Sequence, residues 1–368
     1  MNKYSFKNID LTNFLFLLLT PITAVTLVLN WVHADGFNWG QVLLASVLYF
    51  VTGMSITAGY HRLFAHKAYD VHPLVKLIFL IFGAAAFQNS VLKWASDHRL
   101  HHAKVDSSED PYSIEEGFFH AHMGWVILKK NGEIKDRYAR DFLSDKMILW
   151  QHNYYFFIAV VAGLILPALL GQYFFDSWLG GLAVGGFARV VFVHHCTFFI
   201  NSLCHYIGTT PYTDTNSAKD SWFMALLTFG EGYHNFHHFF QTDYRNGIRW
   251  YHFDPTKWLI GILNSSGLAT KLKRTSHEKI LAARMQMKIK NLNDKIAADS
   301  KFQNEIDALK SRVLESLKTF QELKNQYKMT KAKEIRERML KAKSDFHSTL
   351  EAWDLYLRYL QASHAFLR

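Results

Sequence analysis

Nine histidines in four short segments are the residues of this sequence whose type and spacing could do chemistry. They are His61, His66, His98, His101, His102, His205, His234, His237 and His238. An H-x-x-H-H pattern occurs twice among them, and an H-x4-H pattern precedes both. Positions i, i+3 and i+4 share a helical face, so each H-x-x-H-H pattern is predicted to present three imidazoles to one point. The H-x4-H spacing suits the end of a helix better than a continuous helical face.

The number of these histidines predicts two metal ions. A single transition-metal ion takes at most about six ligands, which is fewer than nine. Imidazole binds Fe, Zn, Cu and Ni, so the ligand type alone does not identify the metal. One such pattern could arise by accident on a surface or in a core. Two copies and an H-x4-H pattern, each beside an apolar run, argue against accident.

The composition divides the chain into two parts. Hydrophobic residues make up 49% of the 368 residues, and the formal net charge is +10. Up to about Gly267, long apolar runs alternate with histidine-rich loops, whereas the remainder contains neither Gly nor Pro. From Glu278 onward, 19 Lys and Arg face 12 Asp and Glu, so this tail carries +7 of the net charge. We therefore expect two domains, 1–270 and 271–368, and no nucleic-acid partner for the histidine site.

Four apolar runs approach the roughly 20 residues that a bilayer core requires. They are residues 11–32, 41–60, 154–175 and 178–200. Very short links join the first to the second and the third to the fourth, so we predict an all-α integral membrane protein with four spans in two hairpins. The links contain no Lys or Arg, and the positive-inside rule therefore places both termini and the histidines on the cytoplasmic side.

A fifth apolar run, residues 73–92, is predicted to lie in the plane of the membrane or to re-enter it. Lys76, Gln88 and Asn89 within it are costly in lipid unless they are paired. A crossing at this point would also separate His66 from His98. The histidines would then lie on opposite sides of the membrane.

The tail is predicted to form long amphipathic helices. Apolar residues recur there at steps of three or four, which is one helical face. They are Ile306, Leu309, Val313, Leu317, Phe320 and Leu323. A helical hairpin or an oligomerising coiled coil explains this pattern, and a membrane-surface or partner-docking role remains open.

Several longer motifs give the histidine patterns a context. In chain order they are "ITAGYHRLFAH", "FQNSVLKWASDHRLHH", "DPYS" with "GFFHAHMGW", "FINSLCHYIGTTPY" and "GEGYHNFHHFFQTDYRNGIRW". Over roughly residues 7–270 the chain resembles the integral-membrane fatty acid desaturases, and within them the stearoyl-CoA (delta-9 acyl-CoA) branch. The resemblance does not extend to the tail.

The resemblance implies an O2-dependent enzyme with a cytoplasmic di-iron centre. All nine histidines would hold the two Fe2+ ions, and Asn201 would reach the metal through a water. Zinc is expected as a substitute in purified protein. The implied reaction introduces a cis double bond, at the delta-9 position, into a saturated long-chain acyl-CoA.

The resemblance also implies the substrate contacts. Gln88, Trp94 and Thr197 match the residues that bend the acyl chain, and Phe198 stands where a second tryptophan is usual. Residues matching polar contacts to coenzyme A are Lys129, Lys130, Asn8 and Asp97. Ser96, next to Asp97, replaces a frequent arginine, and a serine cannot grip phosphate bidentately. A phospholipid-linked or carrier-linked acyl chain is therefore the second candidate substrate.

The chemistry requires help from outside this chain. Removing hydrogens from an unactivated methylene needs an oxidant that metals generate from O2. Histidines would hold the metals, and acidic residues such as Asp97 and Glu231 are expected to orient these histidines. The chain contains no haem motif, cysteine cluster or glycine-rich dinucleotide fingerprint, so a separate donor, a cytochrome b5-like or ferredoxin-like protein, is implied.

Three other functions fit parts of the pattern. A lipid or alkane hydroxylase can use the same histidine patterns. A metal transporter would need its ligands at the middle of the bilayer, whereas these lie at its edge. A membrane scaffold with a degenerate site would lack metals, yet all nine positions are occupied.

Overall fold

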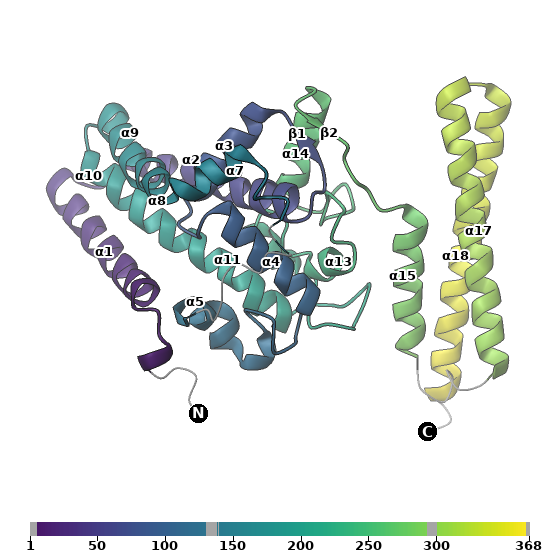
Figure 1. Cartoon of the computed structure of the whole chain (residues 1–368). Coiled ribbons are helices and arrows are strands. Elements are labelled where there is room, and N and C mark those ends of the chain that lie inside the picture. Colours follow the sequence, from purple (N-terminus) through teal and green to yellow (C-terminus); the bar gives the residue numbers. More distant parts are fainter. Residues whose placement is uncertain (1–5, 130–137, 139, 293–299, 366–368) are drawn as a thin grey trace. The chain divides into compact units, whose positions relative to one another are not determined.

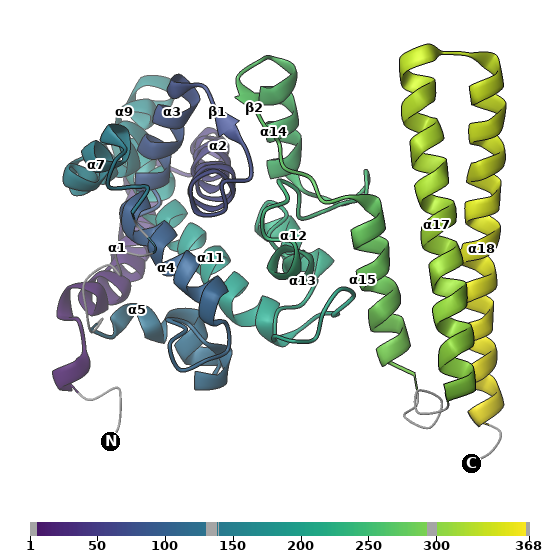
Figure 2. The same cartoon turned by 45° about the vertical axis from the view of Figure 1, so that its right-hand side comes forward.

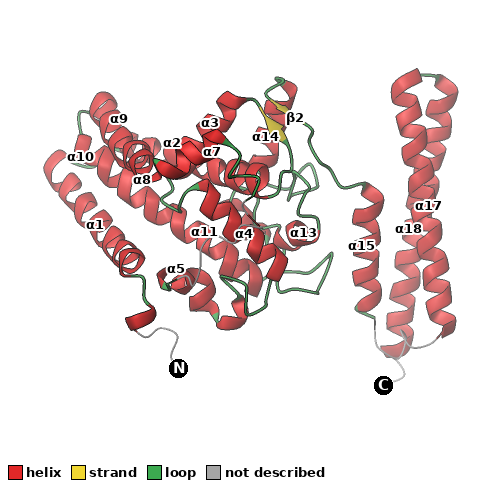
Figure 3. Cartoon of the chain, viewed as in Figure 1, coloured by secondary structure: helices red, strands yellow, loops and turns green. Residues whose placement is uncertain are grey.

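A computed structural model describes residues 6–129, 138, 140–292 and 300–365. The chain forms two compact units, shown in Figure 1. The membrane unit comprises Met1–Thr209 with Thr215–Arg274, and the tail unit comprises Thr210–Asp214 with Thr275–Arg368. Helices dominate both units, and the described strands form one short pair (Figure 3).

Four helices of the membrane unit are long and apolar enough to cross a membrane. They are Leu11–Asp35, Trp39–Ala65, Tyr155–Phe175 and Trp178–Tyr206. The first span is α1 (Leu11–Asp35), and the second consists of α2 (Trp39–Met54) and η2 (Ser55–Ala65). The third consists of α8 (Tyr155–Val160), η5 (Val161–Ile165) and α9 (Leu166–Phe175). The fourth consists of α10 (Trp178–Gly180), η6 (Gly181–Ala188) and α11 (Arg189–Tyr206). The prediction of four spans in two successive pairs is confirmed.

Arg189 ties these helices together at the start of α11. It is buried and donates to the carbonyls of Gly163 at 2.8 Å, Gly185 at 2.7 Å and Ala85 at 3.0 Å. A charged side chain within a span is expensive unless its donors are satisfied, and here backbone carbonyls of several segments satisfy them. These hydrogen bonds therefore explain how the fourth apolar run accommodates its one charged residue, Arg189.

Residues 73–92 are not one helix. The run divides into α3 (Pro73–Ala84), a turn, and the start of α4 (Val91–Lys104). The 12 residues of α3 extend only about 18 Å at 1.5 Å per residue, which is short of a bilayer core. Lys76 pairs with Asp145, and Gln88 donates to Thr197 at 2.9 Å, so polar groups within the run have partners. These observations support the in-plane interpretation.

Shorter elements complete the membrane unit and surround the histidine segments. They are η1 (Phe6–Asn8), β1 (Asp70–Val71), η3 (Ile114–Glu116), η4 (His120–Gly124), α5 (Trp125–Ile127), α7 (Lys146–Asn153), α12 (Trp222–Leu227), α13 (His234–Phe239), α14 (Pro255–Ser265) and β2 (Ala269–Thr270). Strands β1 and β2 pair antiparallel, with Asp70 opposite Thr270 and Val71 opposite Ala269. This pairing joins the segment after the first histidine pattern to the end of the unit.

The tail unit consists of α15 (His277–Lys290), α17 (Ser300–Thr330) and α18 (Lys333–Ala365). Helices α17 and α18 form a long hairpin (Figure 2). Its core contains Met285, Ile289, Leu292, Ile306, Val313, Trp353, Leu357 and Leu360. The predicted apolar face of 306–323 contributes Ile306 and Val313 to this core and buries Leu317 and Leu323 as well.

We expect topology reporters inserted after His66 and after Pro111 to report the same side of the membrane, because α3 is too short to cross between them. A reporter in the link at Gly36 should report the opposite side, which provides the control. Protease protection or glycosylation mapping measures this directly. Opposite answers for His66 and Pro111 would contradict the in-plane placement of α3.

Candidate metal centre

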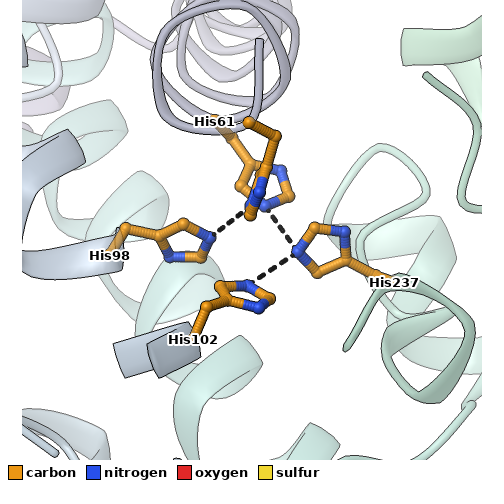
Figure 4. A group of neighbouring side chains, drawn as sticks. His61, His98, His102 and His237 are labelled. Carbon is orange, nitrogen blue, oxygen red and sulfur yellow. Dashed lines mark hydrogen bonds between the residues drawn. The ribbon is translucent and has the colours of Figure 1, made fainter. Parts of the chain in front are cut away.

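The structure brings all nine predicted histidines together as two neighbouring groups. The five-histidine group contains His61, His66, His98, His102 and His237. The four-histidine group contains His101, His205, His234 and His238. Within each group the ligand atoms all lie within 4.8 Å of one another. Figure 4 shows His61, His98, His102 and His237 of the first group converging from η2, α4 and α13.

Each H-x-x-H-H pattern divides its histidines between the two groups. On α4, His98 and His102 belong to the five-histidine group, whereas His101 belongs to the other. Helix α13 does the reverse, because His234 and His238 belong to the four-histidine group and His237 to the five-histidine group.

The expectation that each pattern points to one site is therefore wrong. Positions i and i+4 are about 40° apart around a helix, while i+3 lies about 100° from i+4. One helix between two sites can thus serve both, and the two helices do so in opposite senses. This explains why the pattern occurs twice.

A π-helix accounts for the five-residue spacing of the first pattern. The segment η2 continues α2 with the wider i to i+5 hydrogen bonding, and the His66 amide donates to the His61 carbonyl at 3.1 Å. Residues five apart lie above one another in such a helix. His61 and His66 consequently share a face, with His66 at the helix end as the spacing predicts.

The geometry of both groups fits metal ligation through Nε2. Neighbouring Nε2 atoms are 3.0 Å apart for His61 and His237, 2.9 Å for His66 and His98, and 3.0 Å for His205 and His234. Two imidazole nitrogens at about 2.1 Å from one ion, at right angles, would be about 3 Å apart. The Nε2 atoms of each group are therefore spaced so that they could bind the same metal ion.

Burial favours the neutral form of several of these imidazoles. Burial, followed by the neighbouring imidazoles, lowers the pKa of ligands outside the four spans well below the usual range. They are His66, His98, His102, His234, His237 and His238. A neutral imidazole offers a lone pair to a metal, so the electrostatics agree with the geometry.

The loop after α4 orients three histidines through their Nδ1 atoms. It contacts two of them directly and the third through the hydroxyl of Ser217. His101 Nδ1 lies 2.8 Å from Asp110, and His98 Nδ1 lies 3.2 Å from the Tyr112 hydroxyl. His205 Nδ1 lies 2.7 Å from the Ser217 hydroxyl, which donates to Asp106.

Such partners fix the tautomer that directs Nε2 at a metal. The histidine patterns by themselves do not indicate these residues. The acidic run that directly follows the second histidine pattern was the available signal.

Glu231 orients His61, as expected for an acidic residue beside the ligands. Its carboxylate lies 2.9 Å from His61 Nδ1 and 2.9 Å from the Arg62 guanidinium. Burial alone would raise the pKa of Glu231, but His61 and Arg62 outweigh burial and lower it. Arg62 also pairs with Asp254 at 3.0 Å, so a buried ionic cluster holds η2 in place.

A cavity of about 550 Å³ passes beside both histidine groups. Among its lining residues are His61 and His98 of one group, His234 of the other, and Asn201. Its size falls in the usual range for small-molecule sites, about 300–1,000 Å³. A ligand in this cavity would lie next to any bound metals.

The predicted bending residues form one hydrogen-bonded chain in the cavity wall. Trp94 Nε1 donates to Gln88 at 3.2 Å, and Gln88 donates to Thr197 at 2.9 Å. The neighbours of Gln88, Phe87 and Asn89, have positive φ angles of 55° and 79°. Non-glycine residues rarely adopt this conformation, so the turn stores strain where it aims Gln88 into the cavity.

Phe198 also lines the cavity and is itself buried. The aromatic side chain expected next to Thr197 is therefore part of the wall.

The predicted head-group residues lie partly at this cavity. Lys129 and Asp97 line it, and the Lys129 amide donates to the Asn8 carbonyl at 2.7 Å. Lys130 lies outside the described residues. Ser96 lines the cavity too, and its hydroxyl donates to the Leu92 carbonyl at 2.6 Å.

Other histidines have partners that the sequence did not indicate. His194 lies 2.7 Å from the Ala86 carbonyl and lines the cavity. His195 contacts His122 at 3.1 Å, and His122 contacts the Ser202 hydroxyl at 3.0 Å. His120 is buried and also lines the cavity.

Comparisons with known proteins agree with this site. Residues 37–266 match the fatty acid desaturase family model. Acyl-CoA desaturase 1 of Saccharomyces cerevisiae is 45% identical over 259 residues, covering 70% of this chain and 51% of that protein. A probable acyl-CoA desaturase of Schizosaccharomyces pombe is 42% identical over 253 residues, with coverages of 68% and 53%. An sn-1 stearoyl-lipid 9-desaturase of Synechocystis is 38% identical over 239 residues, with coverages of 64% and 73%.

The chain belongs to the fatty acid desaturase family. It spans about half the length of the two yeast relatives. The resemblance stated from the motifs is confirmed at the level of the family.

We expect Asp110→Asn to weaken metal binding at the four-histidine group, because it removes the charge that orients His101. Loss of such a partner typically lowers metal affinity by about 10–100-fold. Elemental analysis after dialysis against a chelator should show one ion per chain instead of two. Glu109→Gln is the matched control, since Glu109 is exposed and pairs with Lys104 at 2.7 Å. Equal metal content in the two variants would show that Asp110 does not support a ligand.

Proposed function

We propose that this chain is an O2-dependent di-iron desaturase that introduces a cis double bond, at the delta-9 position, into a saturated long-chain acyl-CoA. The single observation that carries this proposal is the cavity lined by members of both histidine groups and by the bending residues. Residues 1–270 form the catalytic domain in this proposal, and 271–368 form an extension.

The nine histidines hold two iron ions, with Asn201 contributing through a water. Bound iron supplies the oxidising power from O2 that removing hydrogens from a methylene requires. The protein binds the chain, fixes its bend and keeps water from the reacting carbons. Zinc, which imidazole also binds, is the expected substitute after overproduction.

The bend is placed by helix geometry. The Trp94 ring stacks on His98 with ring centroids 5.1 Å apart. Trp94 thus lines the cavity and also contacts His98, a proposed metal ligand. A chain bent against Trp94, Gln88 and Thr197 has its bent carbons next to the five-histidine group, which selects the position of the double bond by orientation.

The head group lies at the polar mouth of the cavity. Lys129 is exposed there, and Asp10, Asn13 and Glu109 line the same cavity. Lysine attracts phosphate as a point charge, which suits coenzyme A. A lipid-linked acyl chain is the second candidate, because one relative is named for a stearoyl-lipid substrate and the others for acyl-CoA.

The site is on the cytoplasmic side in this proposal, as are both termini. The links between paired spans lack Lys and Arg, whereas the segments that carry the histidines are rich in both.

Two electrons per turnover come from a separate cytochrome b5-like or ferredoxin-like donor. The tail helices are a candidate site for oligomerisation or for another partner.

Expression in cells that lack their own desaturase should produce fatty acids with a new double bond at carbon 9, located by mass spectrometry. His238→Ala should lower this product by at least about a hundredfold, because it removes a metal ligand. His347→Ala, at an exposed position of the tail unit, should leave it unchanged. A hydroxylated product, or a product that survives in the His238 variant, would refute the proposal.

Replacing Lys129 and Lys130 together by Ala should raise KM for acyl-CoA roughly five- to tenfold and leave kcat nearly unchanged. The reason is that charge-assisted contacts to phosphate are lost while the metal site stays intact. The salt dependence of KM should flatten as well. Lys271→Ala, at a distant exposed position, is the control. Unchanged kinetics, or activity on intact phospholipid alone, would rule out acyl-CoA recognition by these lysines.

A further inference from the structure

The positive charge of the tail is concentrated in one segment. Residues 324–343, named here the tip segment, contain eight basic and two acidic residues. The basic ones are Lys324, Lys328, Lys331, Lys333, Arg336, Arg338, Lys341 and Lys343. The rest of 278–368 holds eleven basic and ten acidic residues and is nearly neutral. Six of the seven net charges of the tail therefore belong to the tip segment.

The fold places this segment at the closed end of the hairpin, where α17 ends and α18 begins (Figure 2). Lys331, with a φ of 54°, makes the turn. All eight basic side chains are exposed. The ion pairs described in the tail unit, Lys288 with Asp354 and Lys290 with Asp214, involve none of them. The charges of the tip are thus exposed, with Lys324 and Lys331 lying over the rings of Phe320 and Tyr327.

Apolar side chains are exposed among these charges. Met329 is 87% exposed at the end of α17, and Leu340 on α18 is 50% exposed. Elsewhere the hairpin buries Leu323 and Leu357, although Leu355 and Tyr359 on α18 are also exposed. Unburied apolar groups surrounded by lysine and arginine are typical of helices that rest on lipid head groups.

We propose that the tip segment binds the anionic head groups of the bilayer that holds the four spans. Clusters of four to eight basic residues on an amphipathic helix favour anionic lipid, each contributing about fivefold to partitioning near the surface. The same chain is anchored in that bilayer, so the tip encounters lipid at a high effective concentration. Lipid also provides an apolar partner for Met329 and Leu340.

The test uses the full chain in nanodiscs made of phosphatidylcholine, with or without phosphatidylglycerol. An environment-sensitive dye attached to a Met329→Cys variant reports insertion, because the native Cys196 and Cys204 are buried. The emission should shift to the blue with phosphatidylglycerol only. High salt should reverse the shift, because screening shortens the range of the attraction.

Two matched sets of substitutions in the dye-labelled chain isolate the tip charges. Replacing Lys328, Lys331, Lys333 and Arg336 by Gln should abolish the shift. Replacing four other exposed basic residues of the tail, Lys279, Arg312, Lys318 and Arg358, by Gln should preserve it. Circular dichroism of both variants checks that the hairpin is intact.

Three results would overturn the proposal. The emission could be identical in the two lipids. The shift could survive the loss of the four tip charges. Alternatively, a shift could occur in neutral nanodiscs only after an acidic protein such as cytochrome b5 is added, which would assign the surface to a protein partner. None of these outcomes depends on desaturase activity.

Discussion

The structure depends on directing nine imidazole nitrogens at two points inside a buried site. Such a convergence is unfavourable in isolation, since each ring must be desolvated and held in one tautomer. The surrounding protein meets this requirement with acceptors on the opposite ring nitrogens. Asp110 holds His101, Glu231 holds His61, and Ser217 links His205 to Asp106. A buried ion pair with Arg62 at 2.9 Å then holds Glu231 in turn.

The helices that carry the ligands also form the cavity wall, and this couples binding to chemistry. On α4, Trp94, His98 and His102 follow one another at four-residue steps. On α11, Thr197, Asn201 and His205 do the same. Four residues advance about 6 Å along one face of a helix. Each helix therefore places a proposed bending residue at a set distance from a predicted metal ligand, and a rigid helix preserves that distance.

The tail unit differs in its physical basis. Its helices are stabilised by an apolar core around Trp353 and Ile306, and its charge lies at one end. A charged tip with exposed apolar side chains suits a partner that offers both negative charge and an apolar interior. An anionic bilayer offers both, and the membrane unit already requires a bilayer.

The sequence by itself predicted the nine histidines that the structure brings together and the four helices that are long and apolar enough to cross a membrane. Span number follows from apolar length, and the nine histidines follow from helical spacing, because both are local properties. Only the tertiary structure decided how the histidines divide between two groups, since that depends on where α4 and α13 lie relative to each other. It also decided that η2 is a π-helix, that Asp106 and Asp110 orient ligands, and that Arg189 and His194 are satisfied by carbonyls. The contacts of Arg189, His194 and Asp106 join segments far apart in the chain, and local spacing carries no information about them. Asp110 is only nine residues from His101, in an acidic run that the sequence does show.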